Sequence, residues 1–169
     1  MIEIRLLLAG DDRSKFSSGE ALVDTFFHRY AGQNQFRHRI GSTYVAVADG
    51  DVLGFVTVAP GEIHVDSLPQ EPHLPRYPLP VLRIARLAVD QQHQGRRLGD
   101  ALLAYALGLA LKASNEIGCA GVVVDAKPKA VSFYERYGFH PLKTLDGSLA
   151  GAPLTLFLGI HSIVPRDRA

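Results

Sequence analysis

The segment best suited to chemistry is a short turn rich in glycine and arginine. It runs from Gln94 to Gly99 as Gln-Gly-Arg-Arg-Leu-Gly, after an apolar stretch that ends at Val89 and before a long stretch with helical periodicity. A helix that starts at such a turn offers unpaired N–H groups and about half a positive charge, which attract phosphate. The turn is neither a Walker A loop nor a dinucleotide-binding GxGxxG. The pattern predicts a pyrophosphate site, with tight packing as the alternative.

Tyr134 has the chemistry of a general acid. It lies in the aromatic segment from Phe133 to Phe139, which ends a second helix. A phenol with a pKa of about 10 is protonated at neutral pH and is able to donate that proton. The alternative is an aromatic ring that only packs at a helix end.

A general base is harder to find. The strand Val81 to Val89 contains no Asp or Glu, and only Asp90 lies at its end. Glu62, His64 and Asp66 could supply a base through water, or be solvated loop residues. An α-amine of pKa about 7.7 to 8.0 is appreciably neutral at pH 7, whereas lysine, at about 10.4, is almost wholly charged. A substrate with an α-amine would therefore tolerate a weak or absent base, whereas one with a lysine side chain would not.

Arginines provide the candidate contacts to a polyanion. A charge within an apolar strand needs a partner or a ligand, so we assign Arg86 to the rim of the candidate site and Arg83 to a contact with a polyanionic substrate. The other basic clusters, for which a solvated face is the alternative, contain Arg29, Arg37, His38, Arg39 and Arg76.

The composition is that of an ordinary globular chain. The 169 residues are 47% hydrophobic and 21% charged, with a net charge of +1 and a single cysteine, Cys119. We predict one domain, residues 1–169, without a disulfide or metal site, in a reducing cytoplasm. The small net charge predicts that any polyanion is held by a local patch. Leu98 to Leu111 is too short for a membrane span, so we predict no membrane association.

Periodicity predicts the elements that position these residues. Predicted strands are Met1 to Leu8, Thr43 to Ala48, Val52 to Ala59, Val81 to Val89, Gly121 to Ala126 and Leu154 to Ile163. The first helix follows a capping box, Ser17 and Glu20, and ends near Gly32; the others end at Gly118 and Gly138. For the middle helix we predict a core stripe of Leu98, Leu102, Tyr105, Leu109 and Ile117.

Two connections have their own patterns. Asp49-Gly50-Asp51 predicts a tight hairpin. Pro60 to Pro80, with a proline at every third position from Pro69 to Pro78, predicts an extended polyproline loop. That loop is a connector, a wall of the substrate site or an SH3-type ligand.

In this order the motifs resemble the GNAT superfamily of N-acetyltransferases. That superfamily has a turn of the form Gln/Arg-x-x-Gly-x-Gly/Ala, and its next helix carries Phe-Tyr-x-x-x-Gly-Phe. The resemblance spans residues 42–140, with Arg97 at the middle glycine position of the turn and Lys127 where Asn is often found. It implies an α/β (α+β) fold with a central mixed, mostly antiparallel twisted sheet of about six to seven strands, flanked by about four helices.

The same resemblance implies acetyl-CoA as the cosubstrate. Leu87 and Val89 would hold its pantetheine arm through backbone bonds, the turn would bind its pyrophosphate, and Tyr134 would lie beside the thioester sulfur as the general acid. The implied cofactor-binding residues are Leu87, Ala88, Val89, Gln94, Gly95, Arg96, Arg97, Leu98, Gly99, Lys127 and Phe133.

A narrower resemblance exists to the tRNA-acetylating toxins of the TacT type. It rests on Phe16-x-Ser18-Gly19-Glu20, Asn34-Gln35, Ala59-x-Gly61 and the strand end from Ala85 to Asp90. It implies acetylation of the α-amino group of aminoacyl-tRNA, neutralisation by a ribbon–helix–helix antitoxin, and a homodimer. The alternatives are a GNAT enzyme acting on a small-molecule or protein amine, and a CoA-binding module without turnover.

Overall fold

The computed structural model describes residues 1–64, 75, 78–142 and 153–163, and the chain forms two compact units. The first unit comprises Met1–Ala59 and Ile84–Ala106, and the second comprises Pro60–Arg83 and Leu107–Ala169. The single domain spanning residues 1–169 stays a prediction.

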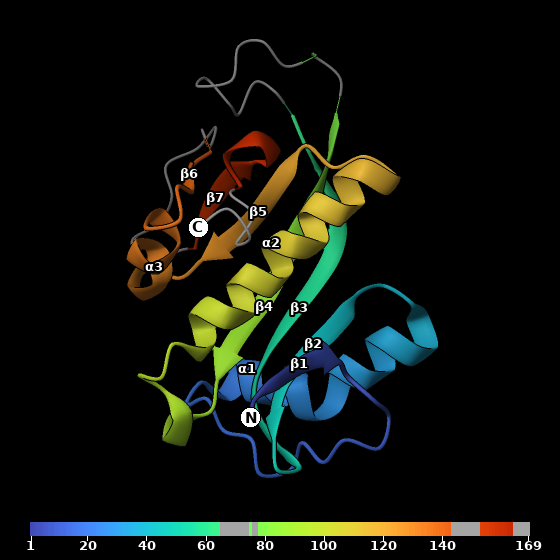
Figure 1. The fold of residues 1–169 in the computed structure, drawn as a ribbon, viewed down its shortest axis with the longest axis vertical. Helices are drawn as coiled ribbons and strands as arrows, with labels where there is room; N and C mark the ends of the chain where they lie inside the picture. Colours follow the sequence, from blue (N-terminus) through green and yellow to red (C-terminus); the bar gives the residue numbers. More distant parts are fainter. Residues whose placement is uncertain (65–74, 76–77, 143–152, 164–169) are drawn as a thin grey trace. The chain divides into compact units, whose positions relative to one another are not determined.

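The strands form one seven-stranded sheet in the order β1-β2-β3-β4-β5-β7-β6 (Figure 1). Their bounds are β1 (Glu3–Leu6), β2 (Ser42–Ala48), β3 (Asp51–Ile63), β4 (Leu79–Val89), β5 (Gly121–Ala126), β6 (His140–Pro141) and β7 (Leu154–Gly159). The α-helices are α1 (Ala21–Thr25), α2 (Leu98–Glu116) and α3 (Val131–Glu135). The predicted mixed, mostly antiparallel sheet with flanking helices is confirmed.

Aromatic rings form much of the core of the first unit. Phe27 stacks on Phe55 with ring centroids 4.1 Å apart, and Phe16 meets both rings edge-on. The buried Gln35 side chain donates to the Leu7 carbonyl (2.9 Å) and accepts from the Thr43 N–H (2.7 Å). These bonds hold the helical segment after α1 beside the ends of β1 and β2, which pair antiparallel.

The first helix differs from the prediction at both ends. Its N-cap is Glu20, and no side-chain capping bond closes there, so the Ser17 and Glu20 capping box is wrong. Instead, Ser18 donates to the Asp24 carboxylate from both its N–H (2.9 Å) and its Oγ (2.7 Å). The helix also continues past Gly32, through π-type turns at Phe26–Tyr30 and Gln33–His38. It ends at Arg39, whose φ of 57° is left-handed.

The predicted hairpin is confirmed, but its strands run further than predicted. Asp49 and Gly50 have φ of 51° and 82°, and Ala48 pairs with Asp51 across the turn. β3 continues to Ile63 and β4 begins at Leu79, so extended structure covers both ends of the predicted proline loop. Most of that loop, with its predicted polyproline geometry, lies outside the described residues.

The predicted stripe of α2 has the wrong phase at its C-terminal end. Ile117 follows the last helical residue and is 87% exposed, because the helix ends at Glu116. The buried face includes Leu102, Leu103, Ala106 and Ala110, each 0% exposed. Gly118, with a φ of 101°, donates to the Ala113 carbonyl and closes the helix as predicted.

The second unit packs around β5 and β7, which pair antiparallel along their whole length. Its buried apolar residues include Ile63, Leu79, Val81, Val123, Leu142 and Phe157. β7 ends at Gly159 and a short 3-10 turn, Ile160–Ser162, follows, so the last strand is shorter than predicted. The predicted frayed tail and most of the turn before β7 lie outside the described residues.

Candidate functional site

The turn after β4 begins from a well-anchored strand end. Leu87, Ala88 and Val89 are half-buried in β4, and the Asp90 N–H donates to the Leu53 carbonyl (2.8 Å). The Gln94 side chain donates back to the Val89 carbonyl (3.1 Å), so the turn folds over the end of its own strand.

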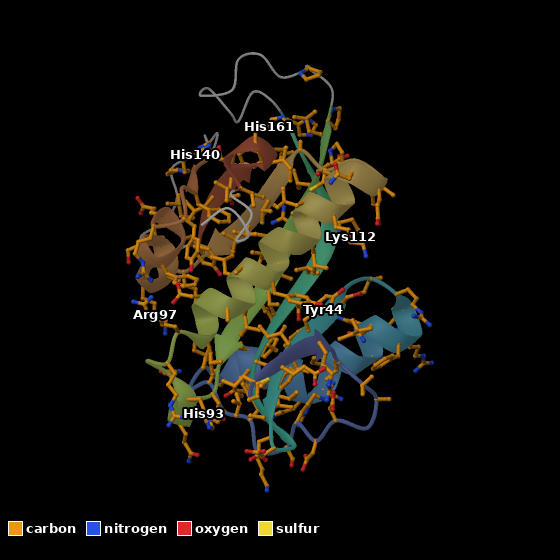
Figure 2. All side chains as sticks on the ribbon, viewed as in Figure 1. Tyr44, His93, Arg97, Lys112, His140 and His161 are labelled. Carbon is orange, nitrogen blue, oxygen red and sulfur yellow. The ribbon has the colours of Figure 1, made fainter. Side chains whose placement is uncertain are left out.

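Two residues of the turn have left-handed backbones. Gly95 has a φ of 82°, and the space that a Cβ would occupy is open. Arg97 has a φ of 60°, the conformation that favours glycine. This explains why a glycine fits the middle position of such a turn. Gln94, Gly95, Arg96 and Arg97 are all exposed, and Figure 2 labels Arg97 where the chain enters α2.

The N-terminus of α2 has the backbone groups that bind an anion. The first helical bond runs from the Ala101 N–H to the Arg97 carbonyl (3.1 Å). The N–H groups of Leu98 and Gly99 precede that bond, so they have no acceptor within the helix. Leu98 is buried and fixes the helix, while Gly99 is half-buried. With two exposed guanidinium groups beside it, this terminus fits a pyrophosphate.

The two arginines of β4 have different surroundings. Arg83 donates to the Asp125 carboxylate (3.1 Å), which also accepts from the Thr155 hydroxyl (2.6 Å). Arg86 places its guanidinium over the Phe26 ring, 4.0 Å from the centroid, and partial burial lowers its pKa. Arg86 is exposed, and a guanidinium stacked on a ring can still donate its N–H groups to an anion.

Tyr134 is the buried phenol of the second unit. It is 5% exposed, and its ring meets Phe133 and Phe139 edge-on at centroid distances of 5.0 and 5.5 Å. Burial raises the pKa of Tyr134 to about 12, so the hydroxyl carries its proton at neutral pH. Gly138, with a φ of 95°, turns the chain after α3 and brings Phe139 back against this ring.

The Asp90 carboxylate is hydrogen-bonded to backbone N–H groups. It accepts from the N–H groups of Ser17 (3.0 Å) and Gln92 (2.9 Å), and His93 Nδ1 lies 3.5 Å away. Burial alone would raise the pKa of Asp90, but these two N–H groups and His93 outweigh it and lower the pKa. No local pattern predicts this arrangement, because Ser17 and Asp90 lie 73 positions apart.

The remaining predicted site residues are spread over both units or lie outside the described part. The basic cluster of Arg29, Arg37, His38 and Arg39 is exposed in the first unit. Lys127 is exposed and precedes the short turn Pro128–Ala130. Glu62 and His64 are exposed, and Asp66 and Arg76 lie outside the described residues. Within the described ranges, no group of three His, Cys, Asp or Glu side chains could hold a metal. No helix there has the length and apolar character needed to cross a bilayer.

The predicted site residues thus form two groups. The first unit brings together Arg86, Phe26, the end of β4 and the whole turn that leads into α2. The second unit holds Tyr134, Phe133, Lys127 and the Arg83–Asp125 pair.

Comparison with known proteins gives one family. A model described as an acetyltransferase (GNAT) domain matches residues 39–141. A tRNA-acetylating toxin of Mycobacterium tuberculosis is 36% identical over 138 residues, which cover 80% of this chain and 82% of that protein.

Solved structures of AtaT are also similar to this chain. AtaT complexed with acetyl-methionyl-tRNAfMet matches with a TM-score of 0.85 and 26% identity, covering 96% of each chain. A mutant AtaT toxin bound to the C-terminus of the antitoxin AtaR matches with a TM-score of 0.79 and 25% identity, covering 96% of this chain and 94% of that one.

Proposed function

The chain belongs to the GNAT family of acetyltransferases, and on this premise we propose that it acetylates the α-amino group of aminoacyl-tRNA and so blocks translation as a toxin. The acetyl donor is acetyl-CoA. The observation that carries the proposal is the 36% identity to a tRNA-acetylating toxin over four-fifths of the chain. The left-handed turn at the start of α2 adds to it, because that turn has the backbone and charge a pyrophosphate needs.

In this proposal the turn holds the nucleotide end of the cosubstrate. The N–H groups of Leu98 and Gly99, together with Arg96 and Arg97, face the pyrophosphate. Leu87, Ala88 and Val89 offer strand-like backbone bonds to the pantetheine arm. Lys127 and Phe133 remain predicted cofactor contacts.

Tyr134 supplies the proton that the reaction returns to sulfur. The amine nitrogen attacks the thioester carbonyl, the C–N bond forms, and the C–S bond breaks with its electron pair on sulfur. The Tyr134 hydroxyl donates to that sulfur and later regains a proton from solvent, while the new amide nitrogen loses a proton to water. A phenol with a pKa of about 12 is fully protonated beforehand, as this role requires.

The acceptor amine needs little help to lose its proton. β4 carries no carboxylate from Leu79 to Val89, and both oxygens of Asp90 are already bonded to backbone N–H groups. An α-amine, with a pKa of about 7.7 to 8.0, is partly neutral at physiological pH without a base. Arg86 is the arginine we assign to the substrate, because its guanidinium rests on a ring rather than a carboxylate. Arg83 as an RNA contact stays a prediction.

The proposal also covers the partner protein, the oligomeric state and the cellular compartment. We propose neutralisation by an antitoxin of the ribbon–helix–helix class, a homodimeric protein, and action in the cytoplasm, where charged tRNA is found. The AtaT toxin bound to the C-terminus of an antitoxin supports the first of these, because that toxin shares this fold. Size-exclusion chromatography with light scattering tests the dimer directly.

The decisive experiment offers the protein acetyl-CoA and charged bulk tRNA. We expect N-acetyl-aminoacyl-tRNA, which resists the deacylation that a free α-amine assists, and no reaction with uncharged tRNA. A panel of free amines is run in parallel. If every charged tRNA is refused while small amines are acetylated efficiently, the acceptor is a small amine and the toxin assignment fails.

A further inference from the structure

A set of long-range hydrogen bonds joins the N-terminal loop to the start of the cofactor turn. Ser17 donates its N–H to the Asp90 carboxylate (3.0 Å), and its carbonyl accepts from the Gln91 N–H (2.8 Å). The other Asp90 oxygen accepts from the Gln92 N–H (2.9 Å). Asp90 therefore bridges two segments that are far apart in sequence, with one oxygen for each.

The next residues extend this connection on both sides. The Gln94 side chain donates to the carbonyls of Val89 (3.1 Å) and Ser18 (3.4 Å). Ser18 in turn donates twice to Asp24 in α1. Gly19 has a φ of 91°, and a Cβ there would collide with the Gln91 side chain. The positive φ favours glycine at this point, and any larger residue would also have to displace the end of the Gln91 side chain.

The turn needs such external support. Gly95, Arg96 and Arg97 are exposed, so packing does little to fix their backbones. Arg97 is also held at a φ of 60°, and a residue held in that region persists only where its surroundings impose it. The hydrogen bonds of Asp90 and Gln94 can supply this support. They fix the backbone of residues 91–97 relative to the end of β4 and the N-terminal loop.

We propose that Asp90 is a positioning residue that, through Ser17 and Gln92, sets the cofactor turn in the form that binds the pyrophosphate of acetyl-CoA. This rests on the proposed function, since it assumes that the turn binds that group. Asp90 itself touches neither the cosubstrate nor the acceptor. The N-terminal loop, Ser17–Gly19, is then part of the cofactor site, although it lies about 70 positions before the turn.

Asp90→Asn tests the proposal with little change in shape. The amide has one acceptor oxygen, so one of the two N–H groups loses its partner. Because hydrogen bonds to charged groups are strong, we expect acetyl-CoA affinity to fall by about 10- to 100-fold in calorimetry. Gln94→Ala should weaken binding in the same direction. Asp12→Asn is the matched control, because Asp12 also accepts from a backbone N–H, that of Ser14 (2.9 Å), but lies outside this connection.

A second donor separates positioning from general damage. S-acetylpantetheine carries the thioester but no pyrophosphate, so its rate of acetyl transfer should be the same in Asp90→Asn and in the wild type. With acetyl-CoA, the same variant should show a raised KM and a nearly unchanged kcat. Equal losses with both donors would mean that Asp90 supports the fold rather than the turn, and would overturn the proposal.

The outcomes also separate this proposal from the proposed function. If the wild type does not bind acetyl-CoA, the function fails before Asp90 is tested. If the wild type binds and Asp90→Asn binds equally well, with native circular dichroism, only the positioning role is wrong. Should Asp90→Asn not fold, Gly19→Ala decides, because it strains the contact between the N-terminal loop and Gln91 at a residue outside the proposed cosubstrate contacts. Its affinity for acetyl-CoA should fall, and an unchanged affinity in the folded variant would overturn the proposal.

Discussion

At the scale of single residues, Arg97 combines a backbone that favours glycine with a side chain that favours phosphate. Its φ of 60° costs a non-glycine residue about 1 kcal/mol, whereas glycine adopts it freely. The arginine is therefore retained at a cost in stability, which is consistent with a guanidinium that binds the cosubstrate. The two effects have opposite consequences for stability and for affinity.

Arg97→Gly should thus stabilise the fold and lower the affinity for the cosubstrate. We expect the free energy of unfolding to rise by up to about 1 kcal/mol, while acetyl-CoA affinity falls. Arg96→Gly is the matched control, since it removes the same charge from a residue without a positive φ and should not stabilise. Urea denaturation and calorimetry measure both quantities. Equal stability changes in the two variants would contradict the strain argument.

Tyr134 sets the expected pH dependence of turnover. The reaction needs a protonated phenol and a neutral amine, and burial raises the pKa of Tyr134 to about 12. Activity should therefore rise with pH through the amine pKa of about 7.7 to 8.0 and show no loss from phenol ionisation up to pH 10. A rate profile measured from pH 6 to pH 10 tests this. An alkaline decline in that window, with the fold intact, would assign the proton donor to another group.

Removing the Tyr134 hydroxyl should damage chemistry and spare binding. Tyr134→Phe keeps the buried ring, so we expect turnover to fall by about 10² to 10⁴-fold with acetyl-CoA affinity little changed. Tyr30→Phe, at an exposed tyrosine, is the control and should behave as the wild type. A Tyr134→Phe protein with more than half of wild-type turnover would remove Tyr134 from this role.

At the scale of elements, the start of α2 is the part that bears most directly on cosubstrate binding. Gly99→Glu places a carboxylate where the pyrophosphate should meet the helix. The binding free energy of acetyl-CoA should become less favourable by about 2 to 4 kcal/mol, because the carboxylate repels the pyrophosphate and the side chain occupies its space. The fold should survive, because an acidic side chain suits a helix N-terminus. Gly108→Glu is the control, since Gly108 is exposed on the same helix with open space around it. Unaltered affinity in Gly99→Glu would place the cosubstrate elsewhere.

The elements also show where sequence reasoning succeeds and fails. Turn chemistry is local, so Asp49-Gly50 and Gly118 were predictable from the residues themselves. The phase of α2 was not, because apolar residues occur around much of that helix and Ile117 continues their spacing past its end. The first helix was cut short at Gly32 because glycine is a common stop signal. There it lies inside a helix that continues to His38.

Candidate site residues also divide into those with a local sequence signal and those that depend on long-range contacts. The turn before α2 and the short helix that carries Tyr134 could be predicted because each lies in a contiguous motif. Their roles in cofactor binding and proton transfer stay predictions. The partner of Arg83 and the ring under Arg86 were not, since a sequence shows that a strand charge needs a partner without naming it. The structural role of Asp90 could not be predicted, because its bond to Ser17 spans 73 positions and leaves no periodic trace.

At the scale of the whole molecule, charge limits how the protein can hold RNA. The net charge of +1 gives no overall attraction, so affinity must come from a few arginines. Within the described residues, Arg83 already pairs with the Asp125 carboxylate, whereas the Arg86 guanidinium lies over the Phe26 ring. The two arginines occupy the same strand, three positions apart, and so form a natural pair for comparison.

The salt dependence of turnover follows from this small number of contacts. At subsaturating charged tRNA, raising salt from 50 to 200 mM should lower the rate by about three- to tenfold, as expected for one or two phosphate contacts. Arg86→Ala should lower the affinity for tRNA. It should also reduce the slope of log rate against log salt by about 0.7 to 0.9, the value expected for one lost phosphate contact. Arg83→Ala should reduce the slope by less, because Asp125 holds that guanidinium and competes with phosphate for it. A slope that falls with Arg83→Ala and not with Arg86→Ala would reverse the two assignments, because the arginine that meets phosphate is the one whose removal releases fewer counterions.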